Sequence, residues 1–425
     1  MRTFTVTDGN FSKIINALVE QPEDISELRQ NVSEIISAIR FYGDEELIRH
    51  TNNFDNNGLA LQELRMTQEQ IDHSMRSLST NTIKALELAS VRIHSYHEKL
   101  KPQDVSYKDK SGIELGSRWL PVESAGIYVA PNNPSAVLMS AIPARVAGVA
   151  RIVLATPALN NHINPAIIAA AKICGITEIY RMGGAQGIAA LAFGTQTIPS
   201  VDKISGSGDV YVLEAKKQVF GAVGIDMIEG TSEVIIIADE KNDPYWVAAD
   251  MLAFAEQGGQ IRPILITTSQ SMAQQIISCV YEILPELGRY DAAHNAIEKR
   301  GIVVVVNNLE EAAIASNLIS PKQVQLLVEN PRELLAKITN AGSISLGRHA
   351  PAALNSFIAG PSNILPSGFS SRFSSGVSVM DFMKQQSIIF SDARSFKDVA
   401  NATALLAQAE GLGASALAIT MRQGK

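Results

Sequence analysis

Apolar residues recur at helical spacing in the first part of the chain. In 26–40 they lie on one helical face, and 83–100 repeats the pattern. Apolar residues three and four positions apart are typical of an amphipathic helix that packs on a core. The first set is Leu28, Val32, Ile35, Ile36 and Ile39. We therefore expect residues 1–115 to be mostly helical.

From about Ala125 onward, short apolar segments alternate with helix-like segments. This alternation predicts mostly parallel sheets that are covered by helices on both faces, an α/β fold. A first series has strands at 126–130, 151–155, 178–182 and 203–205, with helices at 137–149, 165–174, 184–193 and 209–219. A second series has strands at 233–238, 263–267, 301–306 and 324–327, with helices at 245–256, 272–284 and 312–318. A loop-like stretch at 367–376 is followed by a β-like 377–380, a short helix and a long helix at 396–410.

Composition restricts the class of protein. The 425 residues are 46% hydrophobic and 19% charged, which is typical of a globular chain with more than one lobe. A net charge of -7 without a basic run argues against a nucleic-acid partner. No apolar run approaches the roughly 20 residues of a membrane-spanning helix, and the first residues lack a signal-peptide pattern. With only Cys174 and Cys279, no disulfide framework is expected, so we predict a cytoplasmic protein.

Two strand-to-helix turns contain closely spaced glycines, although no Gly-x-Gly-x-x-Gly motif opens a helix. They are 183–186 (GGAQ) and 205–209 (SGSGD). Glycine lets a backbone approach a phosphate or ribose closely, and a helix N-terminus favours anions. Turns of this kind also serve simply as tight connections. The residues alone leave both interpretations open.

An ordered series of motifs resembles the histidinol dehydrogenases, a zinc- and NAD-dependent enzyme family. The series covers roughly residues 30 to 422. Its parts are 126–129 (GIYV), 182–195 (MGGAQGIAALAFGT), 201–204 (VDKI), 214–216 (EAK), 232–234 (SEV) and 340–343 (NAGS). The resemblance implies two incomplete Rossmann-like lobes with parallel sheets plus small helical N- and C-terminal pieces. It also implies a homodimer.

The resemblance implies a division of the chain into lobes. Residues 28–127 plus 235–372 would form the first α/β lobe, and 128–234 the second lobe, on the NAD side. Residues 1–27 would be an N-terminal arm, and 373–425 a tail exchanged with the partner subunit.

Three positions correspond to the family's NAD contacts, which are a tyrosine, a glutamine and an asparagine. Tyr128 and Gln186 match the first two, whereas Asp209 replaces the asparagine. An ionised aspartate only accepts hydrogen bonds, so it can bind a ribose hydroxyl but repels a phosphate. We therefore expect NAD as the cofactor, held by these three residues.

The family's four zinc ligands are replaced in this chain. Phe254 and Gln257 stand for a glutamine and a histidine, Ser356 for an aspartate, and Ser415 for a second histidine. Phenylalanine has no donor atom, and neutral amide and hydroxyl oxygens are poor zinc ligands. The sequence predicts no zinc site.

The family's catalytic Glu-His pair is replaced as well, by Lys322 and Gln323. Glutamine cannot transfer protons near neutral pH, so the base would be Lys322 if burial lowered its pKa. The other interpretation is an ordinary surface lysine.

Other positions that match the family's site are retained or altered. Ser232, Glu256 and Glu410 are retained, and Glu410 is a second catalytic candidate. Asn363 replaces a substrate-contacting histidine, and Phe357 follows Ser356. Besides Lys322 and Glu410, the expected substrate pocket contains Ser232, Phe254, Glu256, Gln257, Gln323, Ser356, Phe357, Asn363 and Ser415.

None of the seven histidines occupies a catalytic position of the family. His94 and His97 are three residues apart and so share one helix face, a spacing that is compatible with metal binding. More often, two histidines at this spacing are ordinary surface residues that bind no metal. His349 lies near Ser356 in sequence and is the one histidine with a conceivable relocated role.

The combined prediction is a metal-independent, NAD(P)-linked oxidoreductase that acts on a small polar metabolite other than histidinol. An inactive paralogue that serves as a binding or scaffold protein is the alternative, and a non-redox enzyme a third. A buried Lys322 would favour an enzyme, whereas a pocket blocked by Phe254 and Phe357 would favour the inactive protein.

Overall fold

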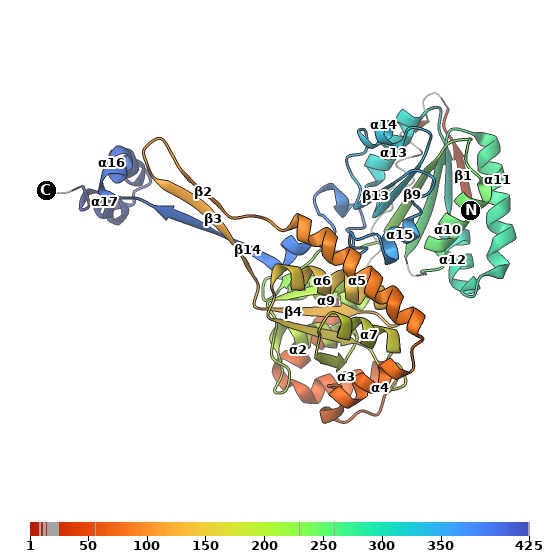
Figure 1. Cartoon of the computed structure of the whole chain (residues 1–425), viewed down its shortest axis with the longest axis horizontal. Helices are drawn as coiled ribbons and strands as arrows, with labels where there is room; N and C mark the ends of the chain where they lie inside the picture. Colours follow the sequence, from red (N-terminus) through yellow and green to blue (C-terminus); the bar gives the residue numbers. More distant parts are fainter. Residues whose placement is uncertain are drawn as a thin grey trace.

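The computed structural model describes residues 1–7, 10–11, 14, 25–55, 57–228, 230–258 and 260–423. It contains two parallel sheets in separate lobes and an antiparallel arm that extends away from both (Figure 1). The predicted α/β class is confirmed. Among the described residues, no helix combines the length and apolarity needed to cross a membrane.

The first lobe is built on a five-stranded parallel sheet of order β6-β5-β4-β7-β8. Its strands are buried between helices, which is why they appear in the sequence as continuous apolar segments. The strands are β4 (Ser124–Val129), β5 (Arg151–Thr156), β6 (Glu178–Arg181), β7 (Lys203–Ser207) and β8 (Gly224–Ile225). The helices between them are α6 (Pro134–Ala147), α7 (Pro165–Ile173), α8 (Gly184–Phe193) and α9 (Val210–Val219).

The N-terminal helices pack on this lobe. Helices α2 and α3 contact α8, α4 contacts α7, and α5 contacts α6. They are α2 (Ser26–Tyr42), α3 (Asp44–Asp55), α4 (Gln68–Arg76) and α5 (Thr80–Leu100), with a short 3₁₀ turn, η1 (Leu61–Glu63). This differs from the expected grouping of 28–127 with 235–372, because the apolar faces of these helices are buried against the five-stranded lobe.

The second lobe is built on a six-stranded parallel sheet of order β1-β11-β10-β9-β12-β13. The strands are β1 (Arg2–Thr5), β9 (Ser232–Ala238), β10 (Ile261–Thr267), β11 (Ile302–Val305), β12 (Gln323–Leu327) and β13 (Ser343–Leu346). The helices are α10 (Pro244–Ala255), α11 (Gln270–Ile283), α12 (Tyr290–Arg300), α13 (Leu309–Ile319), α14 (Pro331–Leu335) and α15 (Ala352–Phe357), with η2 (Leu284–Glu286) after α11.

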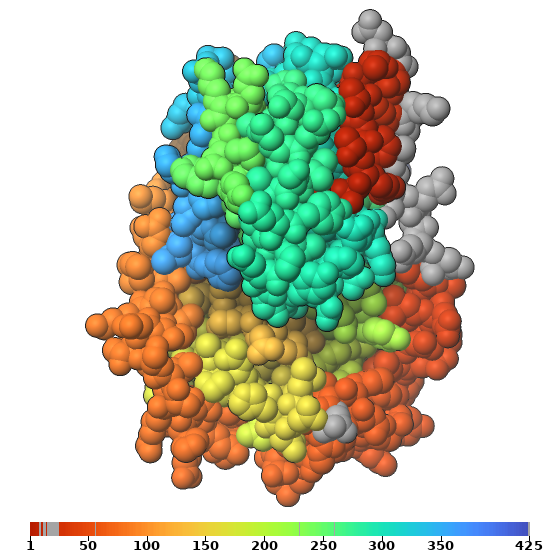
Figure 2. All heavy atoms as spheres, turned by 90° about the vertical axis from the view of Figure 1, so that its right-hand side faces the viewer, coloured from red at the N-terminus to blue at the C-terminus, as the bar shows by residue number. Residues whose placement is uncertain are grey.

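Part of the expected N-terminal arm lies in this second lobe. Strand β1 pairs with β11 at the edge of the six-stranded sheet, far along the chain from its own position. Figure 2 shows it, in dark red, against the upper half of the molecule. Much of the remaining segment 1–27 lies outside the described residues.

The arm is a three-stranded antiparallel sheet that carries the C-terminal helices at its far end (Figure 1). Its strands are β2 (Val105–Lys108), β3 (Glu114–Pro121) and β14 (Met383–Phe390), and the helices are α16 (Ala393–Ala409) and α17 (Gly413–Thr420). Two 3₁₀ turns, η3 (Ser370–Arg372) and η4 (Val379–Phe382), precede β14. The β-like prediction at 377–380 is wrong, since η4 lies there. Val379 and Phe382 are apolar because they are buried in the first lobe's core at the base of the arm.

Candidate functional site

The two lobes meet at opposite ends of their sheets. Only residues 226–231 connect the end of β8 to the start of β9, so the carboxyl edge of the five-stranded sheet adjoins the amino edge of the six-stranded sheet. In the first sheet the chain proceeds outward in both directions from β4, to β5 on one side and to β7 on the other. Ligands of open α/β sheets bind at the carboxyl ends of the strands, where the order reverses in this way.

Tyr128 and Gln186 lie together at this edge. Tyr128 is the penultimate residue of β4 and is 3% exposed. Its hydroxyl accepts a 3.1 Å hydrogen bond from the Gly184 amide, in the first turn of α8. Burial, and then the negative charges of Asp209 and Asp55, raise the pKa of Tyr128. Gln186 is 1% exposed, and neither polar atom of its carboxamide has a partner among the described residues. Most buried polar groups in proteins are paired, so this amide is a clear exception.

Asp209 is the N-cap of α9. Its carboxylate accepts hydrogen bonds from the amides of Tyr211 and Val212, both at 3.0 Å. Aspartate and asparagine cap helices about equally well, so the replacement of the family's asparagine keeps the local structure. It changes the charge of an exposed position at the carboxyl edge.

A buried ion pair fixes the turn before Asp209. Lys216 Nζ lies 2.5 Å from Asp226 Oδ1, and the two side chains are 1% and 0% exposed. Lys216 Nζ also donates to the Gly206 carbonyl at 2.6 Å, and the Gly206 amide donates to Asp226 Oδ2 at 2.8 Å. Gly206 has φ +129, and a Cβ there would lie 1.9 Å from the Tyr128 carbonyl oxygen, so only glycine fits.

The opposite edge holds the residues predicted from the second lobe. Ser232 starts β9, and Gln323 starts β12 beside it, where Gln323 pairs with Val234. Gln323 is 5% exposed, and its Nε2 has no partner among the described residues. Lys322 is half-buried, and its amide donates to the Glu233 carbonyl at 2.8 Å. The half-buried Lys322 does not satisfy the buried condition set for a catalytic lysine.

The end of α10 approaches the same edge. Glu256 is the C-cap of α10, and Gln257 is exposed, with its Nε2 donating to the Ala253 carbonyl at 3.3 Å. Phe254 is 4% exposed and packs in the apolar core of the six-stranded lobe. Phe357, at the end of α15, is 60% exposed. Phe254 thus belongs to the core of this lobe, and Phe357 to its surface.

Residues 356–363 bridge the two lobes. Asn363 Nδ2 donates to the Ser356 carbonyl at 2.9 Å, and its backbone amide contacts the Met139 sulfur at 3.1 Å. Arg92 of α5 donates to the Ile358 carbonyl at 2.8 Å. Ser356 and Asn363 thus lie beside the junction of the lobes.

The donor set at the family's zinc positions does not fit zinc. The Phe254 side chain is buried and has no atom that could bind a metal. The Ser356 hydroxyl donates to the Ala352 carbonyl at 3.3 Å within its own helix. Zinc in proteins is held by thiolates, imidazoles and carboxylates. Within the described ranges, no group of three or more such residues could hold a metal ion.

Glu410 and Ser415 lie on the arm, away from both edges. Glu410 is the C-cap of α16 and Ser415 belongs to α17, the pair of helices at the tip (Figure 1). Within one chain they do not join the residues described above.

The histidines differ in environment. His97 is fully buried, whereas His94 is exposed, so the two do not form a metal-binding pair. Burial lowers the pKa of His97 to about 4. His349 is exposed and its ring lies 5.6 Å from that of Trp246.

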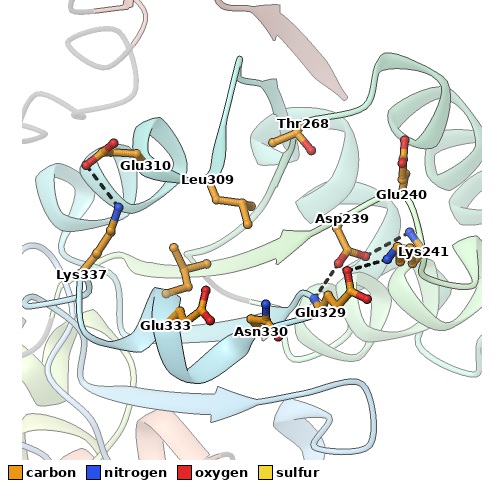
Figure 3. Close-up of a pocket in the computed structure, with 11 residues that line it drawn as sticks. Asp239, Glu240, Lys241, Thr268, Leu309, Glu310, Glu329, Asn330, Glu333 and Lys337 are labelled. Carbon is orange, nitrogen blue, oxygen red and sulfur yellow. Dashed lines mark hydrogen bonds and ion pairs between the residues drawn. The ribbon is translucent and has the colours of Figure 1, made fainter.

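Two cavities lie elsewhere on the six-stranded lobe. One of about 450 Å³ lies at the carboxyl ends of β9, β10 and β12 (Figure 3). Its charges are largely paired, with Lys241 on Glu329 at 2.5 Å and Lys337 on Glu310 at 3.2 Å. It is lined by Asp239, Glu240, Lys241, Thr268, Leu309, Glu310, Glu329, Asn330, Glu333, Leu334 and Lys337, none of them a predicted site residue.

The other cavity has a volume of about 400 Å³. Of the two cavities described, it is the one with a predicted site residue in its wall. Gln257 borders it, and Arg289, Lys299 and Arg300 give its wall a positive charge without a carboxylate. Sequence reasoning missed this cavity because Arg289 precedes α12, whereas Lys299 and Arg300 end it, so the three cations form no run.

Comparison with known proteins agrees with this architecture. The histidinol dehydrogenase family model matches residues 19–423. A histidinol dehydrogenase of Agrobacterium fabrum (strain C58 / ATCC 33970) is 42% identical over 97% of each chain, and one of Gluconobacter oxydans (strain 621H) is 40% identical over 100% of each. The crystal structure of histidinol dehydrogenase from Elizabethkingia anophelis superposes with a TM-score of 0.93 at 32% identity, covering 99% of this chain and 98% of that one. The chain therefore belongs to the histidinol dehydrogenase family.

Proposed function

We propose that this family member is an NAD(P)-linked oxidoreductase that works without zinc on a small polar alcohol or aldehyde other than histidinol. The observation that carries the proposal is the buried Gln186 carboxamide, which has no partner among the described residues and lies beside the Tyr128 hydroxyl. An unpaired buried amide costs about 1–3 kcal/mol, a cost that a bound ligand removes. Tyr128, Gln186 and Asp209 would hold the dinucleotide on the five-stranded lobe.

The chemistry needs a base at the junction of the lobes. Oxidation of an alcohol transfers a hydride from carbon to the nicotinamide ring, and the hydroxyl proton passes to a base. Gln323 cannot accept that proton. Lys322 at the same edge is half-buried in the free chain, so it would act as the base only where bound substrate and cofactor cover it further. Polar contacts to the substrate would come from Ser232, Glu256, Gln257, Ser356 and Asn363.

One observation favours the alternative of an inactive binding or scaffold protein. Both the metal-ligand positions and the base position hold residues that cannot perform the family's chemistry: Phe254 is buried in the core, and Gln323 is an amide. A non-redox reaction in the same place is the third candidate. Cofactor binding separates the first proposal from these two.

Replacing Gln186 by methionine is expected to weaken NAD⁺ binding about tenfold or more. Methionine keeps the length of the side chain but removes both polar atoms, so the hydrogen bonds to the cofactor are lost. Isothermal titration calorimetry of chelator-treated protein with NAD⁺ measures this. Wild-type protein should give saturable binding without metal.

The matched control is Gln30→Met, which removes an exposed amide from α2 and should leave the affinity unchanged. If wild-type protein shows no binding at millimolar NAD⁺, the oxidoreductase proposal fails and the binding or non-redox alternatives take its place.

We also infer a homodimer in which the arm of each chain reaches the partner. The arm and its helices expose many apolar side chains that their own chain does not cover. Exposed apolar patches of this extent usually mark interaction sites. The residues are Val105, Tyr107, Ile388, Ile389, Phe390, Leu405, Leu406, Leu412, Leu417 and Met421. Such an exchange would bring Glu410 and Ser415 to the partner's junction of lobes.

The double variant Leu405→Asp/Leu417→Asp is expected to be monomeric. These side chains are 66% and 58% exposed, so charges there leave the isolated arm intact but oppose burial in an interface. Sedimentation velocity should give twice the chain mass for wild-type protein and for the control Gln408→Asp, which alters an exposed polar residue of the same helix. A dimeric double variant would contradict the exchange of arms.

A further inference from the structure

Helix α3 carries buried polar groups that are not among the expected cofactor contacts. Its buried positions are Asp44, Leu47, Thr51 and Asp55, which form one face against α8. Thr51 Oγ1 and Asp55 Oδ2 have no hydrogen-bond partner among the described residues, although the two residues are 0% and 7% exposed. A carboxylate so deeply buried is normally paired, so Asp55 needs an explanation.

Helix α3 packs on α8, and the hydrogen bonds at its start indicate that the two helices run antiparallel. At its start, the Asp44 amide donates to Gln196 Oε1 at 2.8 Å, and Thr197 Oγ1 donates to Asp44 Oδ1 at 3.0 Å. Both partners follow the C-terminal end of α8. The other end of α3, at Asp55, therefore lies toward the N-terminus of α8, where Gln186 is in the first turn.

The loop after β5 contacts both the end of α3 and the start of α8. The Asn160 amide donates to the Asp55 carbonyl at 3.1 Å, and the Ala158 amide donates to the Asp55 carboxylate. The neighbouring Pro157 packs so closely on Gly183, the N-cap of α8, that a Cβ on Gly183 would lie 2.6 Å from Pro157 Cβ. Asp55 is thus held at the carboxyl edge of the five-stranded sheet.

Burial, and then the negative charge of two carboxylates, raises the pKa of the Tyr128 hydroxyl. The charges of Asp55 and Asp209 both act on its hydroxyl, and among the described residues no cation contributes to the shift of its pKa. Gln186 Oε1 lies over Gly184, where it would be 2.5 Å from a Cβ on that glycine, and Gly184 binds the Tyr128 hydroxyl. The unpartnered amide of Gln186 therefore lies beside the Tyr128 hydroxyl, on which the charge of Asp55 also acts.

We propose that Asp55 is a further nucleotide-binding residue, which with Asp209 makes this site accept a ribose with free hydroxyl groups and reject one that carries a phosphate. The inference rests on the proposed function, since it assumes that the carboxyl edge binds a dinucleotide. An ionised carboxylate accepts hydrogen bonds from hydroxyl or amide groups, whereas it repels a phosphate. Selectivity for NAD⁺ over NADP⁺ would then depend on a helix outside the sheet.

The test is calorimetric titration of the full-length protein with NAD⁺ and NADP⁺ at pH 8, for wild type, Asp55→Asn and the control Glu45→Gln. Glu45 is an exposed acid on the same helix, so the control also removes one negative charge, but at a position in contact with solvent. Asp55→Asn should weaken NAD⁺ binding about tenfold, the usual effect of losing a hydrogen bond to a charged group, and should lower the preference for NAD⁺ over NADP⁺. Its melting temperature should rise, because a buried charge is removed.

Weaker NAD⁺ binding with a higher melting temperature supports a binding role. An unchanged affinity and an unchanged NAD⁺ preference in Asp55→Asn would overturn the inference while leaving the proposed function intact. Equal losses for both dinucleotides with a lower melting temperature would assign Asp55 a structural role and overturn it as well. Failure of wild-type protein to bind NAD⁺ would overturn the proposed function, and this inference with it.

Discussion

Replacing Lys216 by methionine is expected to lower the free energy of unfolding by about 3–5 kcal/mol. The substitution leaves the Asp226 carboxylate, whose side chain is 0% exposed, without its cation. Removing one partner of a buried ion pair costs this much because the remaining charge stays in a poorly solvated place. The change also releases the Gly206 carbonyl from its 2.6 Å hydrogen bond with Lys216. Denaturation followed by circular dichroism measures the loss.

The neighbouring Lys217 provides the matched control. Its side chain is 38% exposed and lies 3.6 Å from Glu214, so Lys217→Met should cost less than about 1 kcal/mol. The double variant Lys216→Met/Asp226→Asn should recover most of the loss, because a neutral amide oxygen still accepts from the Gly206 amide. A cost below about 1 kcal/mol for Lys216→Met would show that the pair does not stabilise the turn.

The ion pair lies beside the proposed cofactor site. Asp226 and Lys216 hold both backbone polar groups of Gly206, and Gly206 precedes Asp209 in the turn at the carboxyl edge. A buried ion pair is weak evidence for stability in itself, since a well-packed apolar pair often does as well. What it provides here is a fixed backbone geometry at the proposed cofactor site.

The parallel sheets were predictable because their strands are buried on both faces. Strand β9, for example, is a continuous apolar segment from Val234 to Ala238, and a strand of this kind is visible in sequence at once. The arm was not predictable for the opposite reason. Strand β14 is exposed along almost its whole length, so no alternation of buried and exposed positions marks it.

The candidate site was only partly predictable. Tyr128, Gln186 and Asp209 were found through the resemblance, and they do lie at one edge of the sheet. Asp55 was missed because nothing in its neighbourhood in the sequence distinguishes it from a surface residue at the end of a polar helix. Its burial arises from the packing of α3 on α8, a contact between segments about 130 residues apart.

The contribution of His97 to folding stability is expected to decrease by about 3 kcal/mol between pH 7 and pH 4. His97 lies on α5, which packs against α6 and η4 at the base of the arm, and neither ring nitrogen has a partner among the described residues. Burial lowers its pKa from 6.5 to about 4. Below pH 6.5 the unfolded chain binds a proton that the folded chain excludes, so acidification favours unfolding until the folded pKa is reached.

Asp55 acts in the opposite direction over part of this range. Burial raises its pKa from 3.8 to about 6, so the folded chain takes up a proton first as the pH falls, and folding gains stability. The stability of wild-type protein alone therefore mixes two opposing titrations. The difference between His97→Leu and wild type isolates the histidine, because Asp55 is present in both.

Urea unfolding at intervals from pH 7.5 to pH 4 should show this difference growing in favour of His97→Leu by about 3 kcal/mol, most of it below pH 6.5. The control Val91→Leu, which changes an exposed apolar residue of the same helix and removes no titratable group, should keep a constant difference from wild type. A difference for His97→Leu that stays constant over the whole range would mean that the folded protein admits a proton to this ring. The base of the arm would then be open to solvent, and the tight packing of α5 against η4 would have to be abandoned.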